Sequence, residues 1–353
     1  MQAEPHTFLS RHGYLFLAFP GFLVLSLAIV LFESSANMDV YEFKQILASL
    51  MQPDQSGSSE LALLSDSNTT RKISRSRMVL TEIKARYIWL STVVLNLVIP
   101  IYVGFTCGLI IYRAHPRRRL FVVCGVGLML CLAGLTLLAT QNEHHVLYRA
   151  VYGFAYLTLT QSGIIDGHLL QSARGIVSLI NILAAVVPVF AVLAVCSILA
   201  PPPKPQQVDP HFLATQMRQL NEVLYGGSAI LVSGILHMGA WLRWPASLVP
   251  DKGSQEAVLG AALSITIFWG TTFTLMLIVT YLPAAIHLAK RAHDLLASDA
   301  YAKRFPDPDA WLKEHDLRLS LEEHILQFGV LLAPVLAGPL GSFLLAPLNP
   351  VDK

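Results

Sequence analysis

The chain contains several runs of about 20 residues that are almost free of charge, and these runs constrain its fold more than any other feature. A hydrocarbon core about 30 Å thick is crossed by roughly 20 helical residues, because each residue rises about 1.5 Å and every backbone polar group is bonded inside the helix. Five such runs carry no charged residue: 14–32, 87–112, 120–140, 176–200 and 259–282. A sixth run, 223–242, carries only His237 as a potentially charged group. The pattern predicts an all-α, polytopic membrane helix bundle with about six transmembrane helices.

The overall composition agrees with this fold class. Charged residues make up 14% of the 353 residues and hydrophobic residues 54%, whereas an ordinary soluble domain has about 25% charged residues. So little charge excludes a disordered chain and a nucleic-acid-binding module. The four cysteines all lie within apolar runs, where a thiol behaves as a small hydrophobic group. We therefore expect the lipid bilayer, and no nucleic acid, as a partner.

Two further apolar segments decide how often the chain crosses. Residues 146–165 contain Arg149 and three tyrosines at a spacing of four, which suits a helix lying in the membrane interface as well as one that crosses. Residues 329–348 are uncharged but contain three prolines, and each proline removes a helix hydrogen bond. We favour an interfacial segment near 141–174, and a re-entrant or docked segment at 329–348, with a seventh span there as the open alternative.

The distribution of Lys and Arg near the ends of spans predicts the orientation. If 146–165 does not cross, the side of the N-terminus carries thirteen Lys and Arg and the other side eleven. If it does cross, the balance becomes eight against sixteen, which would place the basic turn Arg113–Arg119 outside. We therefore predict six spans with the N- and C-termini cytoplasmic, in a cell membrane and specifically the bacterial inner membrane.

The segments outside the predicted spans are organised as amphipathic helices. In the first loop, Val40, Phe43, Leu47 and Leu50 predict one helix, and Ile73, Leu80 and Ile83 predict a second that continues into the next span. These two helices form either a self-packed hairpin or a surface for a partner helix. The chain is thus divided as follows: 1–33 N-terminal span; 34–86 external helical hairpin; 87–200 membrane helices; 201–222 proline-rich linker and amphipathic elbow helix on the membrane surface; 223–289 membrane helices; 290–353 cytoplasmic tail with the hydrophobic segment.

Few residues inside the spans could carry chemistry. No Asp, Lys or Arg lies at a span centre, and the His-Glu-x-x-His, Gly-x-Ser-x-Gly and phosphate-binding loop motifs are absent from the sequence. We therefore expect no catalytic residues and no enzyme. The strongest single candidate for a functional residue is His237, which together with His145 could ligate a haem. A hydrogen bond across a helix interface is the more common role of such a histidine, so we expect no cofactor and no metal site, with haem as an alternative.

Small and hydroxyl side chains suggest helix packing or a pore. Gly104 and Gly108 have the spacing at which two helix backbones approach closely. Thr266, Thr271 and Thr274 could form a polar stripe along the last clear span, although threonine hydroxyls often return to their own helix carbonyls. A pore would need several copies of the chain. Gly104, Gly108, Thr266, Thr271 and Thr274 are therefore candidates for a pore or for packing.

Three functions are compatible with the sequence. The first is a non-enzymatic sensor or complex subunit that binds a protein partner, or a second copy of itself, through the external hairpin and the tail. The second is an oligomeric channel or passive transporter, and the third is a haem- or metal-binding membrane protein. We favour the first, because organised amphipathic segments lie outside the bilayer and no catalytic set lies within it.

Overall fold

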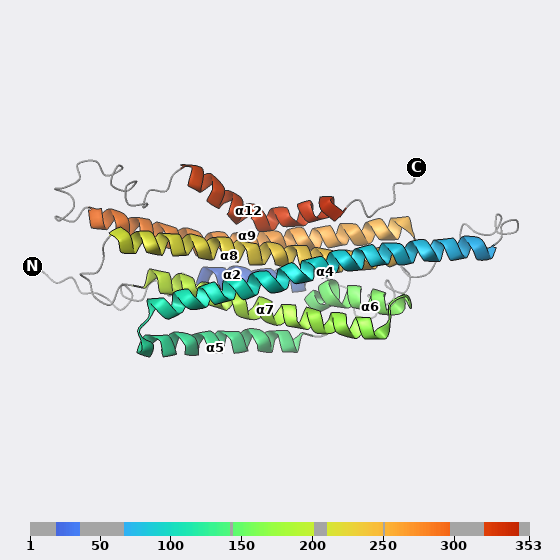
Figure 1. Cartoon of the computed structure of the whole chain (residues 1–353), viewed down its shortest axis with the longest axis horizontal. Helices are drawn as coiled ribbons and strands as arrows, with labels where there is room; N and C mark the ends of the chain where they lie inside the picture. The colour runs from blue at the N-terminus through green and yellow to red at the C-terminus, as the bar shows by residue number, and fades with distance from the viewer. Residues whose placement is uncertain are drawn as a thin grey trace, which may run out of the picture.

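The computed structural model describes residues 19–35, 67–141, 144–200, 210–249, 251–296 and 321–345, and these residues form helices and turns without a strand. In chain order the helices are α2 (Phe19–Ser34), α4 (Ser67–Ala114), α5 (Arg117–Thr140), η3 (Tyr148–Gly153), α6 (Phe154–Gln161), α7 (Gly167–Leu199), α8 (Pro210–Arg243), η5 (Trp244–Leu248), α9 (Lys252–Leu296) and α12 (Leu321–Leu345). The long helices lie side by side in one elongated bundle (Figure 1). The predicted all-α fold is confirmed for these residues.

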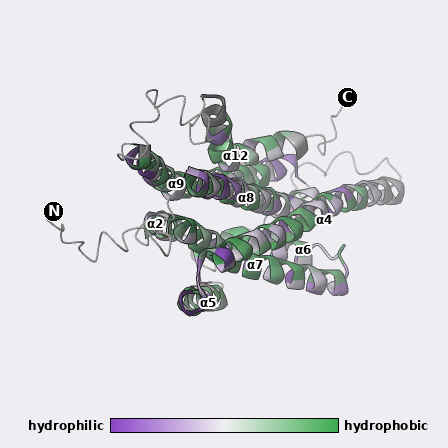
Figure 2. Ribbon diagram, turned by 60° about the vertical axis from the view of Figure 1, so that its left-hand side comes forward, coloured by the Kyte–Doolittle hydropathy of each residue, from purple (hydrophilic) through white to green (hydrophobic). Residues whose placement is uncertain are grey.

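Six helical segments are long and apolar enough to cross a membrane: Met78–Ala114, Arg117–Thr140, Gly167–Leu199, Pro210–Leu248, Lys252–Leu295 and Leu326–Phe343. Apolar residues cover much of their length, as Figure 2 shows. These helices support the predicted multi-pass membrane protein. They are not the same six as the predicted spans, because the last lies in α12. The helix of the first predicted run, α2, has 16 described residues, or about 24 Å of helix.

Contacts between helices establish their directions. Gly21 of α2 lies against Thr280 of α9, while Phe32 packs on Phe268, so these two helices are antiparallel. Contacts of this kind place α4, α7 and α9 in one direction and α2, α5, α8 and α12 in the other. We call the end of the bundle where η5 lies the η5 end. Helix α5 is at the margin of the bundle, where it packs along α7 and only 11% of its apolar window is buried.

The segment 146–165 does not cross the bundle. It forms the π-helical turn η3 and the short helix α6, and a turn at Gly163, whose φ is +61°, leads into α7. α5 ends and α7 begins at the η5 end, so the chain returns to the end from which it left. The interfacial position of this segment stays a prediction. The part of the predicted 141–174 segment after Asp166 differs, because it already belongs to α7.

α12 is both docked and long enough to cross. It contains Pro334 and Pro339 and packs against α8 and α9 between Gln327 and Ser342. Ser228 of α8 donates to the Val330 carbonyl at 2.7 Å, and Arg243 donates to Ser342 at the η5 end. Because α2 and α12 run in the same direction, the start of α2 and the end of α12 lie at opposite ends of the bundle. This arrangement does not support the prediction of both termini on one side.

Two predicted segments outside the spans are parts of longer helices. α8 is continuous from Pro210 to Arg243, so residues 210–222, where an amphipathic elbow helix is predicted, form the first part of this long helix and not a separate element. The segment instead packs inside the bundle, where Gln216 donates to the Ile198 carbonyl and Leu220 is buried. α4 likewise begins at Ser67 and continues without a break into its span, as predicted. The other arm of the predicted hairpin and the tail at 297–320 lie outside the described residues.

Turns at the two ends of the bundle have their own hydrogen bonds. At the η5 end, the backbone N–H of Ser254 donates to Asp251 at 2.6 Å, and this bond lowers the pKa of Asp251, which is ionised and stabilises the start of α9. At the opposite end, His115 pairs with Ser197 at 3.0 Å and joins the α4–α5 turn to α7. Burial, followed by the charge of Arg119, lowers the pKa of His115, so its imidazole is neutral at pH 7.

Candidate functional site

Aromatic residues from three separate segments meet at the η5 end of the bundle. On α8 and η5, the residues His237, Trp241 and Trp244 are spaced by four and three and therefore share one helix face. On α4, Glu82 and Trp89 are separated by seven residues and also share a face. The third set, at a spacing of four on η3 and α6, is Tyr148, Tyr152 and Tyr156. We call the seven aromatic side chains, His237 included, the aromatic cluster.

The rings of the aromatic cluster are in mutual contact. Trp89 stacks on Trp244 at a centroid distance of 5.0 Å and lies 5.6 Å from Trp241 and 6.1 Å from His237. Tyr152 stacks on Trp241 at 5.9 Å and on Tyr156 at 5.3 Å. Aromatic pairs at these distances contribute about 0.5–1.5 kcal/mol each beyond the area they bury. The cluster therefore connects α4, α8 and η3.

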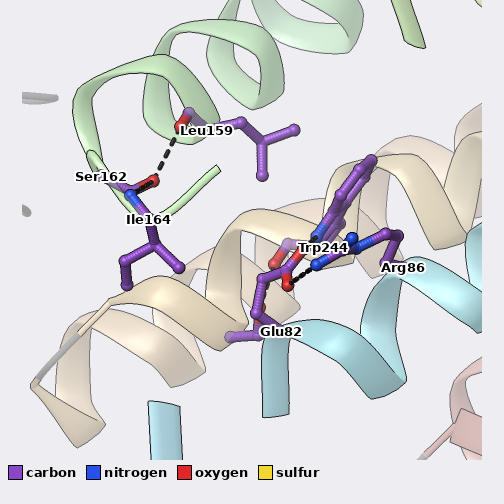
Figure 3. A network of polar contacts seen from close by, with 7 residues as sticks. Glu82, Arg86, Leu159, Ser162, Ile164 and Trp244 are labelled. Carbon is purple, nitrogen blue, oxygen red and sulfur yellow. Dashed lines mark hydrogen bonds and ion pairs between the residues drawn. The ribbon is translucent and has the colours of Figure 1, made fainter. Parts of the chain in front are cut away.

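A buried carboxylate lies beside the tryptophans. The Glu82 side chain is 0% exposed and forms an ion pair with both nitrogens of the Arg86 fork, one turn further along α4. Its Oε1 also accepts a hydrogen bond from Trp244 Nε1 at 3.1 Å, so that α4 and η5 are tied together (Figure 3). A charge buried without partners would cost several kcal/mol. Arg86 and Trp244 therefore offset the cost of burying this side chain.

The turn after α6 is held by its own hydrogen bonds near this carboxylate. Ser162 donates its hydroxyl to the Leu159 carbonyl at 2.7 Å and accepts from the backbone N–H of Ile164 at 3.3 Å (Figure 3). Leu159 is fully buried and packs in one core cluster with Trp89 and Trp244. The turn thus closes the side of the aromatic cluster that faces α6.

Four polar atoms of the aromatic cluster are buried and find no hydrogen-bond partner among the described residues. They are Trp89 Nε1, Trp241 Nε1, Tyr152 Oη and His237 Nδ1. Trp89 is 1% exposed, Trp241 2% and His237 7%. Leaving such a group unpaired costs about 1–3 kcal/mol. Most buried polar groups in proteins are paired, so four of them in one set of touching rings mark this cluster as a candidate site.

The segment that carries the tyrosines is anchored by an acidic residue of α2. Both oxygens of Glu33 accept backbone hydrogen bonds, from the N–H of Val146 at 2.8 Å and from the N–H of Leu147 at 3.1 Å. A carboxylate at this place satisfies two helix N–H groups that have no partner in their own helix and matches the helix dipole. Glu33 therefore fixes the position of η3 and, through it, of Tyr148 and Tyr152.

We expect Glu33→Ala to loosen η3 without unfolding the bundle. The loss of one capping residue costs about 1 kcal/mol, and the effect should be local because α2 packs mainly on α9. Hydrogen–deuterium exchange should become faster in residues 146–153 and stay unchanged in α9. Glu33→Gln is the matched control, because its one remaining oxygen should preserve part of the protection. Unchanged exchange at 146–153 in Glu33→Ala would contradict this role.

His237, the candidate haem ligand of the sequence analysis, belongs to the aromatic cluster. His145 lies before η3, where its backbone carbonyl accepts from Arg149. The ring neighbour that the structure gives His237 is Trp89. In the described part of the chain, His, Cys, Asp and Glu form no group of three or more that could hold a metal. A haem between His237 and His145 stays a prediction.

The residues predicted for a pore or for packing occupy different surroundings. Thr274 Oγ1 accepts from the backbone N–H of Val335, and Thr266 is buried against Gly239 and Gly338. Thr271 is exposed on the surface of α9. Gly104 faces Val187 of α7, and a Cβ on Gly108 would meet nothing within 4 Å. Two of the threonines therefore serve helix packing, and the pore function stays a prediction.

Sequence reasoning missed the importance of Glu82 and the tryptophans. The sequence analysis placed Glu82 in the external loop, whereas it is buried in the bundle. A usable signal was present, because Glu82, Arg86 and Trp89 follow the helical spacing of four and three. The tyrosines at a spacing of four were noticed, but they were interpreted only as an interfacial face.

Comparisons with known proteins add no assignment to this geometry. No family model matches the chain, and neither a curated protein nor a solved structure matches it.

Proposed function

We propose that the protein is a non-enzymatic sensor or subunit of a membrane complex, and that the N-terminal part of α4, residues 67–77, binds its partner. The observation that carries this proposal is the continuity of α4, which runs for 48 residues from Ser67 to Ala114. Its membrane-spanning part begins at Met78. About 16 Å of helix, at about 1.5 Å per residue, therefore precedes the span, and in Figure 1 this part projects past the other helices.

The charge of the projecting part indicates the chemistry of the partner. Residues 67–77 contain Arg71, Lys72, Arg75 and Arg77 and no acidic residue. A helix of one charge sign attracts an oppositely charged surface and repels a like one. The partner is therefore an acidic protein segment, such as an acidic helix that lies against α4.

The base of the projecting part is held firmly in the bundle. Glu82 is tied to Trp244 across the interface between α4 and η5, and Trp89 continues the contact one further turn into the span. A helix anchored in this way transmits a displacement of its N-terminal part to α8. This connection supports a sensor in preference to a passive anchor.

The test is a charge reversal of the projecting part in the full-length protein. We expect the variant with Arg71→Glu, Lys72→Glu, Arg75→Glu and Arg77→Glu to lose its partner when complexes are extracted from native membranes and weighed by native mass spectrometry. The control carries Arg71→Lys, Arg75→Lys and Arg77→Lys, and should keep the complex, because the charge is retained. Complexes of unchanged mass and stoichiometry in the reversed variant would overturn the proposal.

A further inference from the structure

We propose that the turn between α4 and α5 binds an anionic phospholipid, whose phosphate contacts the arginines of the turn and whose acyl chains lie along α5. The arginines are Arg113, at the end of α4, and Arg117, Arg118 and Arg119, in the first turn of α5. This surface lies at the end of the bundle opposite the η5 end, so the inference is independent of the proposed partner of α4.

The turn lies where two apolar helices leave the membrane. The apolar segment Met78–Ala114 ends at the turn, and the next one, Arg117–Thr140, begins there. Tyr112 and Phe121, on either side of the turn, are exposed, and tyrosine is enriched where a membrane meets water. Arginines at this level are beside lipid phosphates, which the planar guanidinium group binds through two parallel hydrogen bonds.

The positive charge of the turn is not compensated by the protein around it. All four arginines are exposed, and in the described part of the chain none forms an ion pair with a carboxylate. Three of them follow one another in the first turn of α5, which contains no acidic residue, although the start of a helix favours negative charge. An anionic partner therefore stabilises both the arginines and the start of α5.

A hydrogen bond to α7 fixes the turn in position. The Ser197 hydroxyl donates to the Leu193 carbonyl at 2.6 Å, so its oxygen accepts from His115 Nε2 at 3.0 Å. Only His115 and Pro116 separate α4 from α5. The backbone that carries the arginines is thus held in place before a lipid binds, which reduces the entropy that binding costs.

The exposed face of α5 extends this surface into the apolar part of the membrane. α5 packs along α7, and most of its other side chains are exposed. Arg118, Val122, Gly125 and Met129 follow the helical spacing of four, three and four, and all four are exposed. A Cβ on Gly125 would meet nothing within 4 Å, so the row is indented at this position and an acyl chain can lie there. One face of α5 therefore offers both a headgroup contact and a chain contact, which favours a phospholipid over a free phosphate.

The experiment titrates the delipidated full-length protein in detergent with dioleoyl phosphatidylglycerol and with zwitterionic dioleoyl phosphatidylcholine, and measures bound lipid by native mass spectrometry. We expect the anionic lipid to bind more tightly. Each arginine near a membrane surface strengthens the binding of an anionic lipid about fivefold at low ionic strength. Arg118→Gln should therefore weaken phosphatidylglycerol binding about fivefold, and the triple variant Arg117→Gln, Arg118→Gln and Arg119→Gln should lose most of the preference for this lipid.

The matched control removes three exposed positive charges from the η5 end, through Lys84→Gln, Arg174→Gln and Lys252→Gln. It should keep the lipid preference of the wild type, because the change in net charge is the same and only its place differs. If the triple arginine variant fails to fold, Arg118→Gln decides the question. Equal affinities of the wild type for the two lipids would overturn the proposal, and so would an equal loss in the control.

A last measurement separates a lipid from a free anion. Glycerophosphoglycerol, which is the headgroup without acyl chains, should give no adduct at the concentration at which phosphatidylglycerol saturates the wild type. Binding of this headgroup as tight as that of the whole lipid would show a site for a soluble anion and would contradict the proposed lipid.

Discussion

Gly270→Leu is expected to separate α12 from α9 and to destabilise the protein by about 3 kcal/mol, the upper part of the usual range for overpacking. A Cβ built on Gly270 would lie 2.6 Å from the Pro334 carbonyl oxygen and 3.0 Å from Val335 Cα. Both atoms belong to the backbone of α12, so no side-chain rotation can relieve the clash. The helix itself has to move.

The displacement should be visible beyond the site of substitution. The backbone N–H of Val335 donates to Thr274 Oγ1 at 3.2 Å, and Gly338 lies against Thr266. Both contacts join α9 to α12 and should be lost together. Thermal unfolding in detergent should occur at a lower temperature, and proteolysis should reach α12 before the rest of the bundle.

Gly260→Leu is the control for this prediction. Gly260 lies on the same helix, is exposed, and a Cβ there would meet nothing within 4 Å. It should unfold at the wild-type temperature or slightly above, because a glycine in a helix interior is replaced by a better helix former. A Gly270→Leu protein as stable as Gly260→Leu would show that α12 is not packed on α9 at this point.

Glu82→Leu is expected to destabilise the η5 end by about 3 kcal/mol, as for other buried ion pairs that lose one partner. The substitution leaves the Arg86 guanidinium without its carboxylate and Trp244 Nε1 without its acceptor. The usual cost of removing one partner of a buried ion pair is about 3–5 kcal/mol. We expect a value at the lower end, because the Arg86 side chain is 30% exposed and can reach water. The loss should appear as easier chemical unfolding, together with a change in tryptophan fluorescence.

Two companion variants separate the causes of this effect. Glu82→Gln keeps an oxygen that can accept from Trp244 and should lose less stability than Glu82→Leu. The double variant Glu82→Leu with Arg86→Leu removes both charges, so it should be more stable than Glu82→Leu alone. If the double variant were less stable than Glu82→Leu alone, the unpaired charge of Arg86 could not be the reason for the loss.

Hydropathy could predict the number and position of most membrane helices, because the requirement for about 20 uncharged residues is set by the bilayer and not by the fold. The helix at 321–345 was harder to predict. Its prolines argue against exposure to lipid, but the effect of a proline depends on what lies beside it. Here the absence of a side chain at Gly270 lets the backbone of α12 approach at Pro334, and Thr274 Oγ1 accepts a hydrogen bond from the N–H of Val335. Neither relationship can be recognised from sequence spacing.

The candidate site could be predicted only in part. The sequence singles out His237 as the only potentially charged residue of its span, and the structure shows it buried in the aromatic cluster. Its neighbours come from α4, η3 and η5, and no spacing rule connects segments so far apart in the sequence. Glu82 belongs to the predicted external hairpin, and its burial could not be predicted because its partner Trp244 is far away in the sequence.

The parallel pairing of α4 and α7 imposes an order on assembly. Gly104 faces Val187 and His115 faces Ser197, so these two helices run in the same direction and are neighbours without a direct connection. During synthesis α4 emerges first, and α7 can pack against it only after α5, η3 and α6 have been synthesised. The face of α4 that α7 will cover is exposed in the meantime. A chain that stops before residue 167 would therefore present this face to chaperones or to degradation by membrane proteases.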